Sequence, residues 1–235
     1  MLKTDLHTHS IASGHALNTV YELAIEAKNK EVSLLGIVEH GPLMEGAPHE
    51  GYFWVSNQLD ELYGVRLLLG VEANILNDRG EIDLKDEEII KKQSLVLAGL
   101  HARTPYEKGD YDHTQSVVSA MRNNFVHVIS HPYRERFPIN IEKVVEAACR
   151  TGTLLELNNQ VFKNESSNQI FLEAYKKMVD LCRKYGHPLV IGSDAHVAKD
   201  VGNDKCVMAV KSEIGLLDDM VLNNNPEELL KWIKK

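Results

Sequence analysis

Cysteine is scarce in this chain of 235 residues, which has only Cys149, Cys182 and Cys206. The number is odd and no two of them form a Cys-x-x-Cys pair, so the sequence does not predict a disulfide framework. A chain of this length buries enough apolar surface to fold without crosslinks. We expect reduced thiols in a reducing compartment.

Long apolar runs are also missing. No stretch approaches the roughly 20 residues that span a bilayer. The first residues lack the basic segment and apolar core of a secretory signal. We therefore expect a cytoplasmic protein with no membrane partner.

Positive charge is in deficit. The chain has 26 Lys and Arg against 34 Asp and Glu, which gives a formal net charge of −8. A general nucleic-acid binder would present a basic face, so the charge argues against nucleic acid as a partner. It does not exclude a small phosphorylated substrate, because bound cations can reverse the local field.

The chain does contain a regular alternation of short apolar runs with amphipathic segments. The runs are nearly continuous in apolar residues, which is typical of parallel strands that are covered on both faces. The predicted strands are Lys3 to His7, Leu34 to Glu39, Arg66 to Glu72, Leu95 to Leu100, His127 to Ser130, Thr153 to Leu157 and Pro188 to Gly192. The clearest predicted helices are Thr19 to Lys30, Ile141 to Arg150, Gln169 to Tyr185 and one that begins at Asn225-Pro226.

Seven strands that alternate with helices predict an α/β fold, a single (β/α)7 TIM-like barrel that occupies residues 1–235. A doubly wound open sheet is the competing fold. Residues suited to bind metal follow six different strands. In a barrel the carboxyl ends of all strands meet at one face, whereas in an open sheet these residues would be spread along a line. The barrel is therefore the preferred prediction.

Imidazole and carboxylate groups at the ends of the strands predict a metal centre. His7 and His9 are two residues apart, so on a strand they point to the same side. Asp194 and His196 repeat this spacing, although an Asx turn with a solvated histidine is the alternative. Glu72 ends a very apolar run, where a carboxylate is costly to bury unless it is paired or holds metal. The predicted metal ligands are His7, His9, His15, His40, Glu72, His101, His131, Asp194 and His196.

These residues resemble the motifs of the PHP (polymerase and histidinol phosphatase) metal-dependent phosphoesterases, in particular the small single-domain bacterial phosphatases. The resemblance covers almost the whole chain. The motifs are Asp5-Leu6-His7-Thr8-His9 with His15, Glu39-His40-Gly41-Pro42, Gly70-Val71-Glu72-Ala73-Asn74, Gly99-Leu100-His101, Ile129-Ser130-His131-Pro132 and Gly192-Ser193-Asp194-Ala195-His196.

The resemblance implies a distorted seven-stranded barrel, phosphoester hydrolysis and three divalent metal ions, usually zinc and sometimes manganese or iron. It also implies small homo-oligomers. One metal would be held by His7, His9, Glu72 and Asp194, and a second by Glu72, His101 and His131. The third would be held by His15, His40 and His196. The family usually has Asp where this chain has Glu39, so the role of that position is left open.

The expected reaction is hydrolysis of a phosphomonoester by a hydroxide that bridges two metals, with no covalent intermediate. Glu72 and Asp194 are the expected catalytic carboxylates. Arg103 and Arg134 are expected to bind phosphate, and Arg136 is a further candidate at the same rim. For each arginine taken alone, a solvated surface position is the competing interpretation.

The remaining histidines and the aromatic residues of the second long loop are harder to assign. His49 and, with less support, His113 are candidates to face substrate. His127 is expected to be structural and His187 to be a solvated cap. Trp54 and its neighbours Tyr52 and Phe53 form either a lid or ordinary packing.

Three other functions remain open. A nuclease needs a track for a polynucleotide, which the acidic balance argues against. An amidohydrolase generally uses a lysine or carboxylated lysine as the bridge, where this chain has Glu72. A metal-binding regulatory protein without activity would keep the ligands and hydrolyse nothing.

Overall fold

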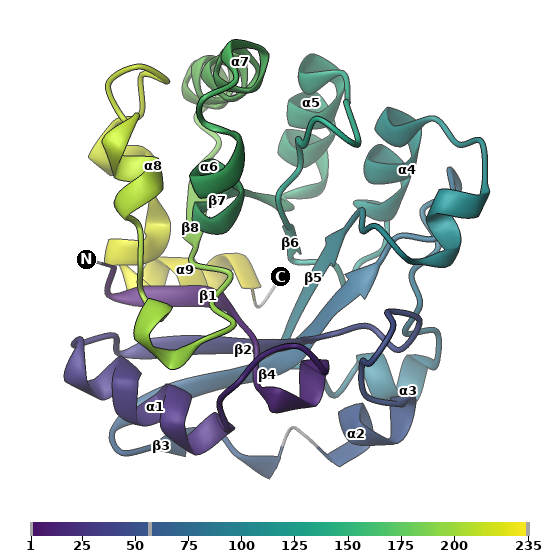
Figure 1. Cartoon of the computed structure of the whole chain (residues 1–235). Helices are drawn as coiled ribbons and strands as arrows, with labels where there is room; N and C mark the ends of the chain where they lie inside the picture. Colours follow the sequence, from purple (N-terminus) through teal and green to yellow (C-terminus); the bar gives the residue numbers. More distant parts are fainter. Residues whose placement is uncertain (1, 56–57, 234–235) are drawn as a thin grey trace.

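The computed structural model describes residues 2–55 and 58–233, so the predicted domain bounds 1–235 include five residues outside the described part. Seven parallel strands of the described residues pair in the order β1-β2-β4-β5-β6-β7-β8, with the helices around them (Figure 1). A short strand, β3 (Glu61–Leu62), pairs antiparallel with the start of β4. The parallel strands are β1 (Thr4–Thr8), β2 (Leu34–His40), β4 (Val65–Asn74), β5 (Leu95–Gly99), β6 (Val128–Ile129), β7 (Leu154–Asn158) and β8 (Leu189–Gly192).

The helices begin and end at residues that commonly cap helices. Thr19 and Glu22 form a reciprocal capping box at the start of α1 (Val20–Asn29). Gly152 and Gly186 follow α5 (Ile141–Thr151) and α7 (Gln169–Tyr185) in the left-handed conformation that ends helices. The other α-helices of the described chain are α2 (Glu50–Val55), α3 (Glu87–Ile90), α4 (His113–Ala120), α6 (Asn159–Glu165), α8 (Lys205–Ala209) and α9 (Pro226–Ile233).

The first and last strands meet and make the sheet a nearly closed barrel. At the carboxyl end, the backbone N–H of His9 donates to the carbonyl of Ala195 at 2.9 Å. Deeper in the barrel the Asn223 side chain joins the two strands, because its Nδ2 donates to the carbonyls of Thr4 at 2.9 Å and Ile191 at 2.7 Å. The predicted barrel is therefore confirmed, and the open-sheet alternative is wrong.

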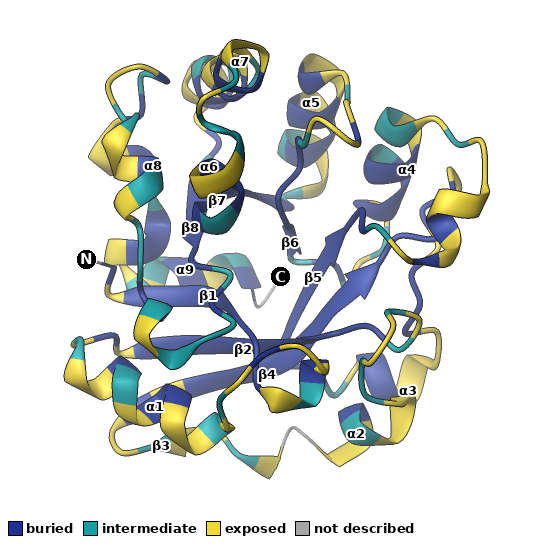
Figure 2. Cartoon of the chain, in the orientation of Figure 1, coloured by how far each residue is buried: buried dark blue, intermediate teal, exposed yellow. Residues whose placement is uncertain are grey.

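Alternate residues of the strands pack into separate cores. Leu34 and Val38 of β2 belong to an interior cluster that α9 covers, while Leu35 and Ile37 pack outward against α1. This two-sided burial explains the continuous apolar runs of the sequence. Figure 2 shows the parallel strands buried along nearly their whole length and the helices exposed on their outer faces. Among the described residues, none of the helices has both the length and the apolar character that a membrane crossing requires.

Two histidines at the amino end of the barrel test the expectations for structural residues. His127 precedes β6 and its Nδ1 accepts a hydrogen bond from the backbone N–H of Val96 at 3.0 Å, as expected for a structural role. His187, predicted as a solvated cap, is 5% exposed, and its Nε2 lies 3.0 Å from the carbonyl of Thr153. That prediction was wrong because Trp232 of α9 packs against the ring of His187.

Candidate metal centre

The nine predicted ligands come together at the carboxyl end of the barrel. Each sits in the last residues of a strand or in the loop that follows it, where strand ends converge. His15, in the loop before α1, is exposed, while His196 and Asp194 are partly exposed. The fully buried members are His7, His9, His40, Glu72, His101 and His131.

Four donor atoms from β1, β4 and the loop after β8 form a compact group. His7 Nε2 lies 3.1 Å from His9 Nε2, 3.3 Å from Glu72 Oε2 and 3.6 Å from Asp194 Oδ1. His9 Nε2 lies 3.6 Å from Glu72 Oε2 and 3.2 Å from Asp194 Oδ1. Two ligands of a tetrahedral zinc ion, each about 2.0–2.2 Å from the metal, are about 3.3–3.6 Å apart. The four atoms therefore fit one cation.

The second carboxylate oxygen of Glu72 belongs to a separate group. Glu72 Oε1 lies 3.0 Å from His101 Nε2 and 2.9 Å from His131 Nε2, and these nitrogens are 3.2 Å apart. The Nδ1 atoms of both histidines have no hydrogen-bond partner among the described residues. These three donor atoms form a second group that fits one cation. Glu72 lies between the first group and the second.

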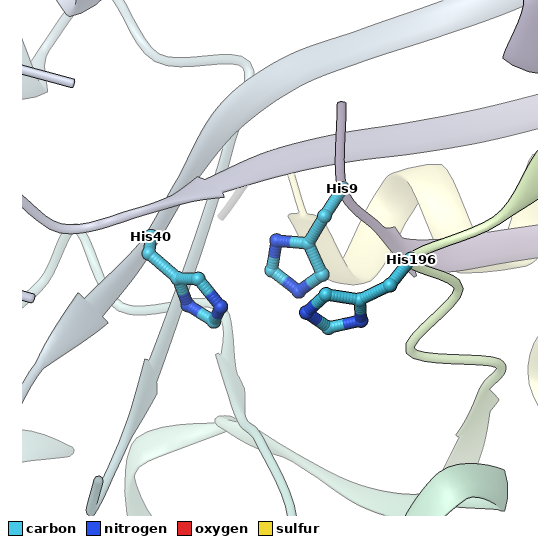
Figure 3. A group of neighbouring side chains, drawn as sticks. All are labelled: His9, His40 and His196. Atoms are coloured by element: carbon cyan, nitrogen blue, oxygen red, sulfur yellow. The ribbon is translucent and has the colours of Figure 1, made fainter. Parts of the chain in front are cut away.

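A third group joins the buried His40 to two histidines nearer the surface, and His40 Nδ1 also lies 3.0 Å from Glu72 Oε2. His15 Nε2 lies 3.2 Å from His40 Nε2, and the ring of His196 stacks on His15 with centroids 4.8 Å apart. Ring nitrogens of His9, His40 and His196 lie within 4.8 Å of one another, so this group adjoins the first. Figure 3 shows these three rings turned toward a common space. Imidazole donors alone suit zinc, iron and other transition metals.

The carboxylates of the site are held in their charged form. Burial raises the pKa of Glu72, but His7 and His101 outweigh this effect, and the pKa lies well below its ordinary value. Burial likewise raises the pKa of Asp194, and His7 and His9 bring it well below the ordinary value. Two ionised carboxylates among imidazole rings form a buried site that attracts cations.

Glu156 of β7 is a functional residue that the sequence reasoning missed. Its Oε1 lies 2.7 Å from His7 Nδ1, and the side chain is buried. Burial lowers the pKa of His7, but the carboxylates of Glu156, Glu72 and Asp194 outweigh burial and raise it well above the ordinary value. The available signal was a carboxylate inside the apolar run of β7, the same signal that identified Glu72.

Asp5 holds the loop after β8 against β1. Its Oδ1 accepts from the backbone N–H groups of Ser193 at 3.1 Å and His7 at 3.3 Å, and its Oδ2 accepts from Gly202 at 2.7 Å. Burial raises the pKa of Asp5. The residue was part of a quoted motif, but only the structure gives it a function, which is to position the loop of Asp194 and His196.

Glu39 lies behind the site and faces hydroxyl groups. Its carboxylate accepts from Ser10 Oγ and Ser13 Oγ, and Tyr52 Oη donates to it at 3.3 Å. Ser13 Oγ in turn lies 3.1 Å from His9 Nδ1. The longer carboxylate thus reaches His9 through a serine, and does not contact the ring directly.

A cavity of about 520 Å³ opens over the donor groups. Arg103 and Arg134 line it, as does the exposed Glu45 of the loop after β2. Arg136, the third candidate, forms an ion pair with Glu107 instead. Two cationic side chains above a cluster of metal donors are suited to bind an anionic group.

The remaining candidates lie away from this cavity. His49 lines a separate surface cavity. His113 Nδ1 bonds to the hydroxyl of Tyr106 at 2.7 Å, at the start of α4. Phe53 is fully buried, whereas Trp54 is 47% exposed, so the two aromatic residues divide between packing and surface.

Comparison with known proteins agrees with this arrangement. The family model of the PHP domain matches residues 5–234. A probable phosphatase of Acetivibrio thermocellus is 38% identical over 98% of this chain and 95% of its own length. A histidinol phosphate phosphatase of Lactococcus lactis, solved with zinc, L-histidinol and phosphate, has a TM-score of 0.62 at 18% identity and covers 91% of this chain and 94% of its own. A chain in the cryo-EM structure of archaeal ribonuclease P with mature tRNA has a TM-score of 0.66 at 14% identity. The match covers 98% of this chain and 91% of that chain.

Proposed function

The chain belongs to the PHP domain family, and from this membership we propose that it is a metal-dependent phosphatase that hydrolyses a small phosphomonoester at a centre of three divalent cations. The observation that carries the proposal is the position of Glu72. Its two oxygens face two separate groups of donor atoms, 3.3 Å from His7 and 2.9 Å from His131. A carboxylate in this position is suited to bridge two cations.

Each donor group would hold one cation. We assign His7, His9, Glu72 and Asp194 to the first, Glu72, His101 and His131 to the second, and His15, His40 and His196 to the third. Zinc is the proposed metal, with manganese or iron as alternatives, because imidazole and carboxylate suit all three. The Lactococcus lactis relative of similar fold was solved with zinc, which supports this choice.

Bound cations supply a water acidic enough to attack near neutral pH and neutralise charge that develops on the phosphoryl oxygens. The protein contributes the geometry. Glu72 fixes the separation of the first two donor groups, and Asp194 presents one oxygen to His7 and His9. Arg103 and Arg134 line the cavity, where their guanidinium groups would bind phosphoryl oxygens and orient the ester.

The alternatives have less support. A cavity of about 520 Å³ suits a small ligand, and a net charge of −8 opposes a polynucleotide. The likeness to a chain of ribonuclease P is a likeness of fold alone. An amidohydrolase would need another bridging group where this chain has Glu72.

A substrate panel tests the proposal. Initial rates would be measured with an aryl phosphomonoester, an aryl phosphodiester, a labelled oligonucleotide and an aryl amide, with the cation content of the same sample determined by elemental analysis. We expect about three cations per chain and the fastest turnover on the phosphomonoester. A metal-loaded protein that cleaves none of the phosphoesters contradicts catalysis, and preferential cleavage of the oligonucleotide establishes the nuclease alternative.

A further inference from the structure

Strand β7 is unusual among the seven parallel strands, because none of the nine proposed ligands comes from it or from the residues that directly follow it. It nevertheless points two polar side chains, Glu156 and Asn158, into the carboxyl end of the barrel. Glu156 is 1% exposed and Asn158 is fully buried. Polar groups that are buried this completely are expected to have a structural or functional partner.

Glu156 and Asn158 contact ligands from three other strands. Glu156 Oε1 lies 2.7 Å from His7 Nδ1, and Glu156 Oε2 accepts from the backbone N–H of His131 at 2.8 Å. Asn158 Nδ2 donates to Glu156 Oε2 at 3.0 Å and to Asp194 Oδ2 at 3.2 Å. The pair therefore links the His7 ring of β1, the backbone of His131 after β6 and the Asp194 carboxylate after β8.

Two of these ligands have a backbone conformation that L-residues rarely adopt. The φ angle is +30° at His131 and +54° at Asp194. Such residues persist only where their surroundings hold them. The hydrogen bonds from His131 to Glu156 and from Asn158 to Asp194 are contacts that hold them in place.

We propose that Glu156 and Asn158 are positioning residues of the cation centre, and that Glu156 selects the tautomer of His7. This inference rests on the proposed function. A carboxylate only accepts hydrogen bonds, so its contact with His7 requires the proton on Nδ1. Nε2 is then the nitrogen that would offer its lone pair to a cation, and it faces His9, Glu72 and Asp194. Carboxylate–histidine pairs orient metal ligands in this way.

Gly192 of β8 leaves the space that this contact needs. A Cβ atom at this position would lie 1.8 Å from Glu156 Oε1 and 2.8 Å from the Cβ of His7. Its φ is not in the left-handed region. A methyl group at position 192 would therefore displace Glu156 by steric overlap alone, without removing a polar group.

The variant Glu156→Gln tests whether Glu156 selects the tautomer of His7 or only fills the space beside it. Two donors, the N–H of His131 and the amide of Asn158, face the Oε2 position. The carbonyl oxygen of the new amide must therefore lie there, which places its NH2 group against His7 Nδ1. That NH2 would donate to Nδ1 and move the ring proton to Nε2, where it blocks a cation.

The test combines cation content with ring ¹⁵N NMR of His7 in zinc-equilibrated protein. The wild type should show a protonated Nδ1 and a metal-bound Nε2. Glu156→Gln should show a protonated Nε2, 10–100-fold weaker zinc affinity at one position and at least a tenfold lower kcat. Glu156→Asp keeps a carboxylate and should retain the wild-type tautomer. Gly192→Ala should also weaken zinc binding.

Matched controls exclude a general loss of stability. Asp83→Asn removes a buried carboxylate that accepts from Asn74 and Leu43 and makes no hydrogen bond to His7 or to the other proposed ligands. Gly186→Ala strains a left-handed residue in open space after α7. Both should lower Tm and leave zinc content and the His7 spectrum unchanged.

The outcomes separate this inference from the proposed function. A wild type that binds no cation overturns both. A wild type that binds zinc and hydrolyses phosphomonoesters, together with a Glu156→Gln protein that keeps the Nδ1-protonated, metal-bound His7, overturns the positioning role alone. If Glu156→Gln does not fold, a wild-type His7 that binds zinc through Nδ1 overturns it equally.

Discussion

The two ends of the barrel use their interior positions for opposite purposes. At the amino end, apolar residues such as Leu34 and Leu154 meet α9, whose Leu229 is fully buried. At the carboxyl end, the same strands present imidazole and carboxylate groups. His127 at the amino end has its pKa lowered to about 4 by burial, whereas carboxylates hold the pKa of His7 well above the ordinary range. One end should supply stability and the other reactivity.

The largest expected effect is at the bridge. Glu72→Gln removes a charge that faces both main donor groups, so we expect kcat to fall by about three orders of magnitude, or about 4 kcal/mol of transition-state stabilisation. Bound cation should fall as well, and Tm should fall with it, because the ionised carboxylate and the bound cation both stabilise the folded state. Initial rates on an aryl phosphomonoester, elemental analysis and thermal unfolding measure these quantities. Full activity in this variant would contradict the account.

The matching change at the other end is Leu229→Ala. Loss of a fully buried leucine from the interior cluster should lower the free energy of unfolding by about 2–5 kcal/mol. The kcat of the folded fraction and the cation content should stay within about twofold, because no donor atom is involved. Urea denaturation and single-temperature kinetics check this. A large loss of kcat in fully folded protein would break the division between the two ends.

His127 provides a test by pH. Burial lowers its pKa from the ordinary 6.5 to about 4 in the folded protein, so as the pH falls the unfolded chain binds the proton first. The stabilisation that the neutral His127 ring contributes is present above about pH 6.5 and is lost as the pH falls toward about 4. Between pH 7 and 5 the loss should be about 2 kcal/mol. His127→Asn should remove this part of the pH dependence, measured by urea denaturation with a chelator present. An unchanged slope would count against the burial of a neutral ring.

The smallest expected effect concerns substrate binding. Arg134→Ala should raise KM for a phosphomonoester by about tenfold, since a charge-assisted hydrogen bond contributes about 1.5–3 kcal/mol. Arg136→Ala is the matched control, because Arg134 lines the cavity over the donor groups and Arg136 does not. Equal changes in KM for the two variants would show that the arginines act only through net charge.

The fold was predictable because it depends on local patterns. Continuous apolar runs marked every parallel strand, although β6 (Val128–Ile129) is shorter than predicted. The predicted bounds of the helix at residues 169–185 agree with α7. The antiparallel β3 (Glu61–Leu62) was missed because it is only two residues long.

The candidate site was predictable only in part. Residue type and position at strand ends indicated all nine donors, which the structure brings together. Glu156 was missed although it has the same signal as Glu72, a carboxylate inside an apolar run. Asn223 was missed because it contacts Thr4, which is 219 residues away in the sequence. Such contacts depend on which residues face the barrel interior, and a sequence pattern does not reveal this for an isolated polar residue.

The central claim is that donors from distant parts of the chain surround cations at one end of the barrel. Elemental analysis of the wild-type protein, purified without added metal and then equilibrated with zinc, tests it most directly, with Glu72→Gln analysed beside it. The account predicts about three cations per chain in the wild type and at least one fewer in the variant. Fewer than one tightly bound cation in the wild type, or equal content in both proteins, would contradict it.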